Sequence, residues 1–173
     1  MKKETIHFDY EVYETSTELN EGDKNLLEAA REVTSRAYAP YSNFLVGAVA
    51  KLQNGETISG TNQENASYPV GICAERVLLS AAATLYKDIA IDTIAISYNN
   101  LKGESSSPVS PCGMCRQALR EYEERTTHSI RLILSGQSGK VFIINNVSQL
   151  LPFSFGGKDL MSNKALNGNP DLV

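Results

Sequence analysis

The chain has 173 residues, of which 42% are hydrophobic and 21% charged, with a formal net charge of -4. This length suffices for one domain with a sizeable core, and the composition excludes disordered and fibrous classes. The acidic balance and scattered basic residues argue against nucleic acid as a partner, because proteins that bind it usually present a basic surface. No apolar run approaches the roughly 18 residues of a spanning helix, and no secretory signal is visible, so we expect a cytoplasmic protein without a membrane partner.

The N-terminal part of the chain predicts an extra strand and a helix. Residues 6–13 alternate apolar and polar side chains, which indicates a short strand or, equally, an ordered arm. Residues 23–39 place apolar side chains at helical spacing, and Asp23 is the expected N-cap of this helix. The expected buried positions of the helix are Leu26, Leu27, Ala30 and Val33.

The middle of the chain predicts a hairpin followed by alternating helices and strands. Residues 44–52 and 56–62 flank Asn54-Gly55, the dipeptide that best tolerates the positive φ of a tight hairpin turn. The later elements are expected as helices at 73–86 and 112–124 and as strands at 93–98, 129–135 and 140–146. Strands interleaved with helices imply an α/β fold, a three-layer α/β/α sandwich, and the hairpin makes its β-sheet mixed.

One domain accounts for most of the chain, because no internal repeat or linker interrupts it. We expect an N-terminal arm at 1–22, a functional domain at 23–161 and a C-terminal tail at 162–173.

Three cysteines fall at the starts of predicted helices, Cys73 in Cys-Ala-Glu and Cys112 and Cys115 in Pro-Cys-Gly-Met-Cys. In a reducing compartment such cysteines are thiols or ligands rather than disulfides. Residues three apart lie on one side of a helix, and a helix N-terminus favours the thiolate, which suits a zinc site. A catalytic zinc keeps one coordination position open, whereas a structural zinc has four protein ligands. Since neither His7 nor His128 lies near these motifs, we expect three ligands and an open fourth position.

Glu75 can share this site with Cys73 only if Cys73 is the non-helical cap, because residues two apart on a helix point about 200° away from each other. Cys-x-Glu followed by Pro-Cys-x-x-Cys is the pattern of zinc nucleobase deaminases, in which the glutamate moves protons and is not a ligand.

On these motifs the chain resembles the cytidine deaminase family, homo-oligomeric enzymes that act on free nucleosides. The resemblance extends through "AYAPYSNFLVGA", "GTNQENASYPVGICAER", "SPVSPCGMCRQAL" and "LLPFSFGGKDL". It implies hydrolytic deamination of cytidine and deoxycytidine to uridine and deoxyuridine with release of ammonia, a step of pyrimidine salvage. It also implies one Zn²⁺ per subunit, held by the three cysteines, with Glu75 as the acid/base.

The resemblance assigns further residues to the substrate and to neighbouring subunits. Asn62 and Glu64 match positions that hydrogen-bond the ribose, and Phe44 matches one that packs on the nucleoside. Phe155 matches an aromatic lent by a neighbouring subunit, which implies a homo-oligomer, with a tetramer favoured. Tyr68 matches a position near a neighbouring site, with a core or interface role as the alternative.

Arg76 follows the first motif directly, and we expect it to donate hydrogen bonds to the thiolates and to offset part of their charge.

Two other functions stay open at this point. The chain could be a deaminase of another aminopyrimidine nucleoside, such as a nucleoside antibiotic. It could instead be a non-catalytic, zinc-stabilised interaction protein, which would have a fourth protein ligand.

Overall fold

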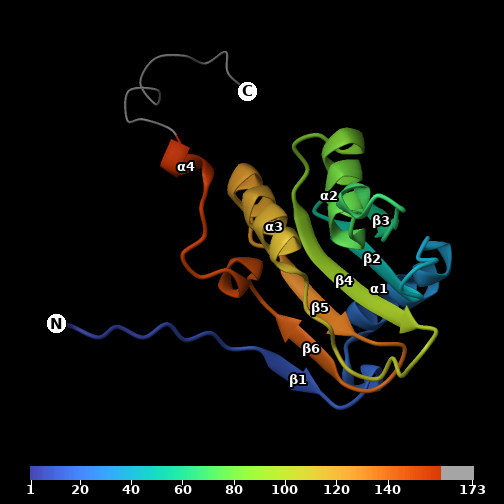
Figure 1. The fold of residues 1–173 in the computed structure, drawn as a ribbon. Helices are drawn as coiled ribbons and strands as arrows, with labels where there is room; N and C mark the ends of the chain where they lie inside the picture. Colours follow the sequence, from blue (N-terminus) through green and yellow to red (C-terminus); the bar gives the residue numbers. More distant parts are fainter. Residues whose placement is uncertain (161–173) are drawn as a thin grey trace.

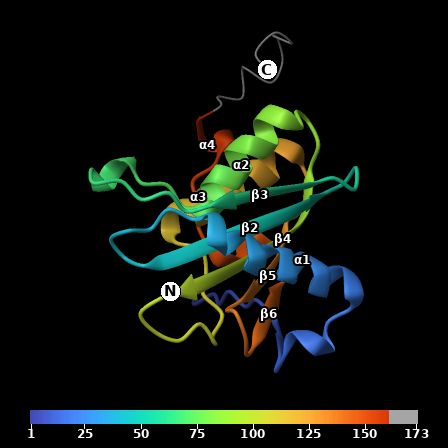
Figure 2. The same cartoon turned by 90° about the vertical axis from the view of Figure 1, so that its right-hand side faces the viewer.

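The computed structural model describes residues 1–160 as a six-stranded mixed sheet with helices on both faces (Figure 1). The strand order is β1-β6-β5-β4-β2-β3, with β4 and β5 parallel and the other neighbours antiparallel. Helix α1 covers one face, and α2 and α3 lie side by side on the other (Figure 2). The expected α/β/α sandwich is therefore confirmed.

The strands are β1 Glu11–Tyr13, β2 Phe44–Leu52, β3 Thr57–Thr61, β4 Ile91–Asn100, β5 Arg131–Ser135 and β6 Val141–Ile144. The α-helices are α1 Glu21–Val33, α2 Ala74–Leu85, α3 Gly113–Thr126 and α4 Gly157–Leu160. Short 3₁₀ helices are η1 Ser16–Glu18, η2 Thr34–Arg36, η3 Tyr68–Val70 and η4 Val147–Leu150.

Two hydrophobic cores flank the sheet, because alternate residues of each strand face opposite sides. The larger core packs Leu78 of α2 and Leu119 of α3 on strand residues such as Ile96. The smaller core packs Leu27 of α1 on strand residues such as Ile133. The four apolar positions predicted to be buried on α1 are all buried.

The predicted hairpin is confirmed, with β2 and β3 antiparallel and Gly55 at a φ of 87° in the turn. The predicted strand at 6–13 is correct only for residues 11–13. Its partner β6 has four residues, and the pairing runs from Tyr13 opposite Val141 to Glu11 opposite Ile143. Residues 1–10 continue as an extended arm without regular structure.

The predicted N-cap of α1 was wrong. Asn20 is the N-cap, and its Oδ1 accepts a hydrogen bond from the backbone N–H of Asp23 at 3.0 Å. The Asp23 carboxylate instead accepts two bonds of 2.7 Å from the guanidinium of Arg131 on β5. An asparagine three residues upstream can satisfy the first turn, and this leaves the aspartate free to fasten the helix to the sheet.

The start of α2, which carries the first cysteine motif, packs closely on β3. A Cβ on Gly60 would lie 2.5 Å from the carbonyl oxygen of Ala74 and from the backbone nitrogen of Leu78. Only glycine permits this approach, so the start of α2 lies directly against the sheet.

The expected tail at 162–173, together with residue 161, lies outside the described residues. Within residues 1–160, none of the helices has the length and apolarity needed to cross a membrane.

Candidate active site

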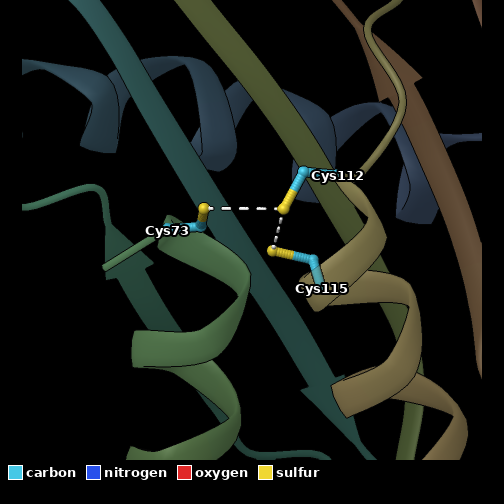
Figure 3. Close-up of side chains that lie close together, drawn as sticks. All are labelled: Cys73, Cys112 and Cys115. Carbon is cyan, nitrogen blue, oxygen red and sulfur yellow. Dashed lines mark hydrogen bonds between the residues drawn. The ribbon is translucent and has the colours of Figure 1, made fainter. Parts of the chain in front are cut away.

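The three cysteine sulfurs meet between the starts of α2 and α3 (Figure 3). The Sγ atoms of Cys73 and Cys112 are 3.9 Å apart, and those of Cys112 and Cys115 are 3.5 Å apart. All three sulfurs lie within 4.8 Å of one another. Zn–S bonds of about 2.3 Å at tetrahedral angles separate sulfurs by about 3.8 Å, so the trio fits one zinc ion.

The backbone at the two helix starts explains this convergence. Cys73 and Cys112 are the N-caps of their helices, both in extended conformation, with ψ of 154° and 168°. Neither cap side chain makes a capping hydrogen bond to the backbone of its own helix, so both sulfurs are free to point into the space between the two helices. Cys115 lies one turn into α3 and is fully buried. The expectation that Cys73 is a non-helical cap is confirmed.

The thiols of Cys73 and Cys115 have pKa values shifted in opposite directions. A hydrogen bond from the Cys115 thiol lowers the pKa of Cys73 to about 6, although burial and the nearby Glu75 oppose this. The same interaction, together with burial, raises the pKa of Cys115. The Cys73 thiolate therefore forms readily near neutral pH, and binding of zinc by Cys115 releases the proton of that thiol.

Within residues 1–160, this trio is the one cluster of three or more metal-ligating side chains. A structural zinc site normally has a fourth protein ligand, and the described residues offer none here.

A cavity of about 190 Å³ opens beside the sulfurs, and two of the cysteines line it, Cys73 and Cys112. Glu75 lines the same cavity and is only 5% exposed. Burial raises the pKa of this carboxyl, because the charged form is poorly solvated there. A carboxyl with a raised pKa can both accept and return a proton near neutral pH, as an acid/base catalyst must.

Phe44, the first residue of β2, and Asn62, the residue after β3, also line this cavity. The Asn62 side chain joins the two strands, since its Oδ1 accepts from the Val46 N–H at 2.7 Å and its Nδ2 donates to the Phe44 carbonyl at 2.8 Å. One N–H of the amide remains for a ligand.

Glu64 binds the neighbouring loop, because its Oε2 accepts the backbone N–H groups of Tyr41 and Ser42 at 2.9 and 3.3 Å. Hydrogen bonds from Ser42 and Tyr41 lower the pKa of Glu64, so the carboxylate stays ionised. Glu64 and Asn62 therefore both turn towards residues 41–46.

Tyr68 and Phe155 do not reach the cavity of their own chain. Tyr68 lies on η3, is 81% exposed, and its ring centroid is 6.3 Å from that of Tyr41. Phe155 is 57% exposed near α3, where its carbonyl accepts a 2.9 Å bond from the Gln117 side chain.

The expectation for Arg76 is met only in part: its positive charge favours the Cys73 thiolate, but a different arginine, Arg116, hydrogen-bonds the backbone beside Cys112. Among the described residues, the side chain of Arg76 makes no hydrogen bond to a cysteine sulfur, and it lies half-buried in the groove between α2 and α3. Arg116 instead donates to the Pro111 carbonyl at 2.9 Å and to the Leu150 carbonyl at 3.0 Å. It thereby ties the residue before Cys112 to η4. Its place directly after the last cysteine is a signal that the sequence reading missed.

Sequence reasoning also missed part of the cavity wall. The ring of Tyr98 stacks on Phe44, with centroids 4.7 Å apart and planes 11° apart. Val109 and Ser110, which precede the second cysteine motif, line the other side. No signal in the sequence marks Tyr98 as a cavity residue, because it is one of several apolar residues in the strand β4.

A catalytic zinc centre requires protein ligands that leave one coordination position open, close to a group that can move protons and to a cavity of ligand size. The three cysteines, the buried Glu75 and the adjoining cavity meet these requirements. Fold and site thus define a zinc-dependent α/β enzyme.

Comparison with known proteins narrows this class to one family. The family model of the cytidine and deoxycytidylate deaminase zinc-binding region matches residues 20–129. A cytidine deaminase of Halalkalibacterium halodurans is 37% identical over 135 residues, which cover 78% of this chain and 95% of that protein. One from Mycoplasma genitalium is 36% identical over 129 residues, covering 75% of this chain and 85% of that protein.

Solved structures agree with the sequence relatives. The crystal structure of cytidine deaminase from Burkholderia pseudomallei matches with a TM-score of 0.67 and 34% identity, covering 79% of this chain and all of that one. The chain therefore belongs to the cytidine deaminase family, and its cofactor is zinc.

Proposed function

We propose that the chain deaminates cytidine and deoxycytidine hydrolytically, giving uridine or deoxyuridine and ammonia, as a step of pyrimidine salvage. The observation that carries this proposal is the buried Glu75 in the cavity beside the three cysteines. Relatives named cytidine deaminase over most of the chain support the choice of substrate.

The cysteines Cys73, Cys112 and Cys115 hold the metal in this proposal. Bound zinc acts as a Lewis acid that makes water nucleophilic at neutral pH. Glu75 accepts the proton of the attacking water as a bond forms to C4 of the base. It passes this proton to N3, then takes the second proton of the former water from the hydroxyl on C4 and gives it to the amino group, which leaves as ammonia when its bond to C4 breaks. Water supplies the oxygen, and the proton balance needs no further reactant.

The nucleoside is held by residues at the other side of the cavity. The free N–H of Asn62 and the second oxygen of Glu64 bind ribose hydroxyls, while Phe44 packs against the nucleoside. The existing bonds of Asn62 and Glu64 to residues 41–46 hold both side chains in place without using all of their capacity.

Phe155 and Tyr68 serve a neighbouring copy in this proposal, because both are exposed and outside the cavity of their own chain. This supports a homo-oligomer, and the family resemblance favours a tetramer. We further propose 23–161 as the deaminase domain and a cytoplasmic location, where three free thiols stay reduced.

A cytidine assay with and without a metal chelator tests the proposal. We expect loss of cytidine absorbance with stoichiometric ammonia, and loss of this activity after chelation. Zinc binding without turnover of cytidine or deoxycytidine would contradict it and favour a zinc-stabilised interaction protein. Turnover only of a modified aminopyrimidine nucleoside would favour the other alternative.

A further inference from the structure

The N-terminal arm, residues 1–10, is an extended segment that projects from the edge strand β1 away from the body of the protein (Figure 1). Every residue of the arm is exposed. Within residues 1–160, the arm makes no backbone hydrogen bonds. The family match begins at residue 20, so the arm lies outside the matched region.

The arm has the side-chain pattern of a strand that lacks a neighbour. Ile6, Phe8, Tyr10 and Val12 alternate with polar residues and are all exposed. Tyr10 packs edge-on against Phe142 of β6, with ring centroids 5.1 Å apart, so the apolar side of the arm continues one face of the sheet. Backbone groups of an extended segment need partners, and an edge without proline or glycine is a ready template for another strand.

We propose that the arm pairs with the same arm of a second copy of this chain, antiparallel and about a two-fold axis at Phe8. Residues 3–5 of one copy then lie on the free edge of β1, residues 11–13, of the other copy. This pairing would join the two six-stranded sheets into one continuous sheet.

The charges of the segment select this register. With Phe8 opposite Phe8, Lys2 lies opposite Glu14 and His7 lies opposite Asp9, and no like charges face each other. Opposite charges and aromatic pairs directly across two antiparallel strands stabilise the pairing, and like charges destabilise it. The segment is thus complementary to itself, which is what an interface between identical chains about a two-fold axis requires.

The two neighbouring symmetric registers are less favourable. A shift that centres the pair on Asp9 places Asp9 opposite Asp9 and Glu4 opposite Glu14. A shift that centres the pair on His7 places Lys3 opposite Glu11, and this is the only pair of opposite charges in that register.

The register centred on His7 depends on Glu11, whose carboxylate already has partners in its own chain. It accepts hydrogen bonds from Tyr13 at 2.8 Å and from Asn145 at 3.1 Å. In the register centred on Phe8, Lys2 and Glu14 also have partners in their own chain, Glu4 at 2.7 Å and Lys140 at 3.2 Å. These are exposed ion pairs of little stability, so they can exchange for the pair between the two arms.

Disulfide trapping in the zinc-loaded protein tests the register. Directly opposite Cα atoms in an antiparallel pair are about 5 Å apart, within reach of a disulfide. Phe8→Cys should therefore give a covalent dimer rapidly under mild oxidation. Ile6→Cys and His7→Cys are matched controls, because their symmetric mates are offset by four and two residues, beyond the roughly 7 Å limit.

Mixing two different cysteine variants provides a second test of the same register. Ile6 lies opposite Tyr10, so Ile6→Cys and Tyr10→Cys proteins should cross-link when mixed and not when either is oxidised alone. Equal trapping at residues 6, 7 and 8, or none at residue 8, overturns the proposal. Faster trapping through His7→Cys than through Phe8→Cys overturns the register.

Deletion of residues 1–9 measures how much the arm contributes to assembly. Zinc content and cytidine turnover report that the shortened protein folds. We expect a lower mass in solution, by a factor of two, at concentrations where the full chain is paired. An unchanged mass contradicts the proposal. Disulfide trapping does not depend on whether Phe155 completes a neighbouring site, and the cytidine turnover of the shortened protein is measured separately, so failure here leaves the proposed catalysis untouched.

Discussion

The starts of α2 and α3 both place a cysteine at the N-cap, yet their surroundings differ. At α2, Cys73 is followed by the buried Glu75 and lies against the sheet at Gly60. At α3, a second cysteine follows one turn later, and Arg116 ties the segment to η4. The candidate group for proton transfer therefore lies at one helix start, whereas two of the three candidate zinc ligands lie at the other.

The largest effect is expected from Cys115→Ala at the start of α3. Removing the buried third sulfur leaves two ligands, so zinc binding and cytidine turnover should both be lost. Metal analysis after dialysis and the ammonia assay measure the two losses. Met114→Ala, at an exposed neighbour, is the matched control and should keep both. Full zinc occupancy in Cys115→Ala would mean that another ligand completes the site.

Glu75→Gln should separate the two helix starts most clearly. The amide keeps the shape of the side chain but cannot move protons, so turnover should fall by about 10²–10⁴-fold while zinc remains bound. Turnover numbers and metal content of the same preparation provide the comparison. Glu121→Gln, exposed on α3, should leave both unchanged. Activity near that of the unaltered protein in Glu75→Gln would remove this carboxyl from the mechanism.

Substitutions of Arg116 and Arg76 test which of these two side chains contributes more to zinc binding. Arg116→Ala should weaken zinc binding by about 10-fold, because partners behind the ligands orient them. Arg76→Ala should have a smaller effect, since its influence on Cys73 is the weakest of those acting on that thiol. Competition with a chelator of known affinity ranks the variants. A larger loss in Arg76→Ala would restore the interpretation drawn from the sequence.

The smallest effect is expected at Asp23, on the opposite face of the sheet from both helix starts. Asp23→Asn should cost about 1 kcal/mol and lower the melting temperature by about 3 °C, with zinc binding unchanged. Burial acts to raise the pKa of Asp23, but the hydrogen bonds and charge of Arg131, together with a hydrogen bond from Asn20, outweigh it and hold this pKa below its usual value.

The pH dependence of this contribution follows from the lowered pKa. The stabilisation is complete above the pKa of unfolded aspartate, about 4, and is lost as pH falls through the lower folded value. Thermal melts of both proteins between neutral and acidic pH measure it. A difference in stability that persists at acidic pH would show that the ion pair is not its source.

Local patterns explain why so much of the fold was predictable. The helical spacing of α1, the Asn-Gly hairpin turn and the helix starts at both cysteine motifs depend on residues close in sequence. The length of β1 was not predictable, because alternation marks residues suited to a strand and not the number of partners that β6 offers. The N-cap at Asn20 was missed because Asp23 is an equally good capping residue until Arg131 is brought beside it.

By itself, the sequence determined the three thiols, the glutamate and their places at helix starts, because each motif is short and its chemistry is local. Only the tertiary structure decided that the Sγ atoms of Cys73 and Cys112, which are distant in sequence, lie 3.9 Å apart. It also decided that Arg116, and not Arg76, hydrogen-bonds the carbonyl of the residue before Cys112, and that Tyr68 and Phe155 lie outside the cavity. The physical reason is the order of the sheet: packing α2 and α3 side by side on one face brings their N-termini together, and no short-range pattern encodes that packing.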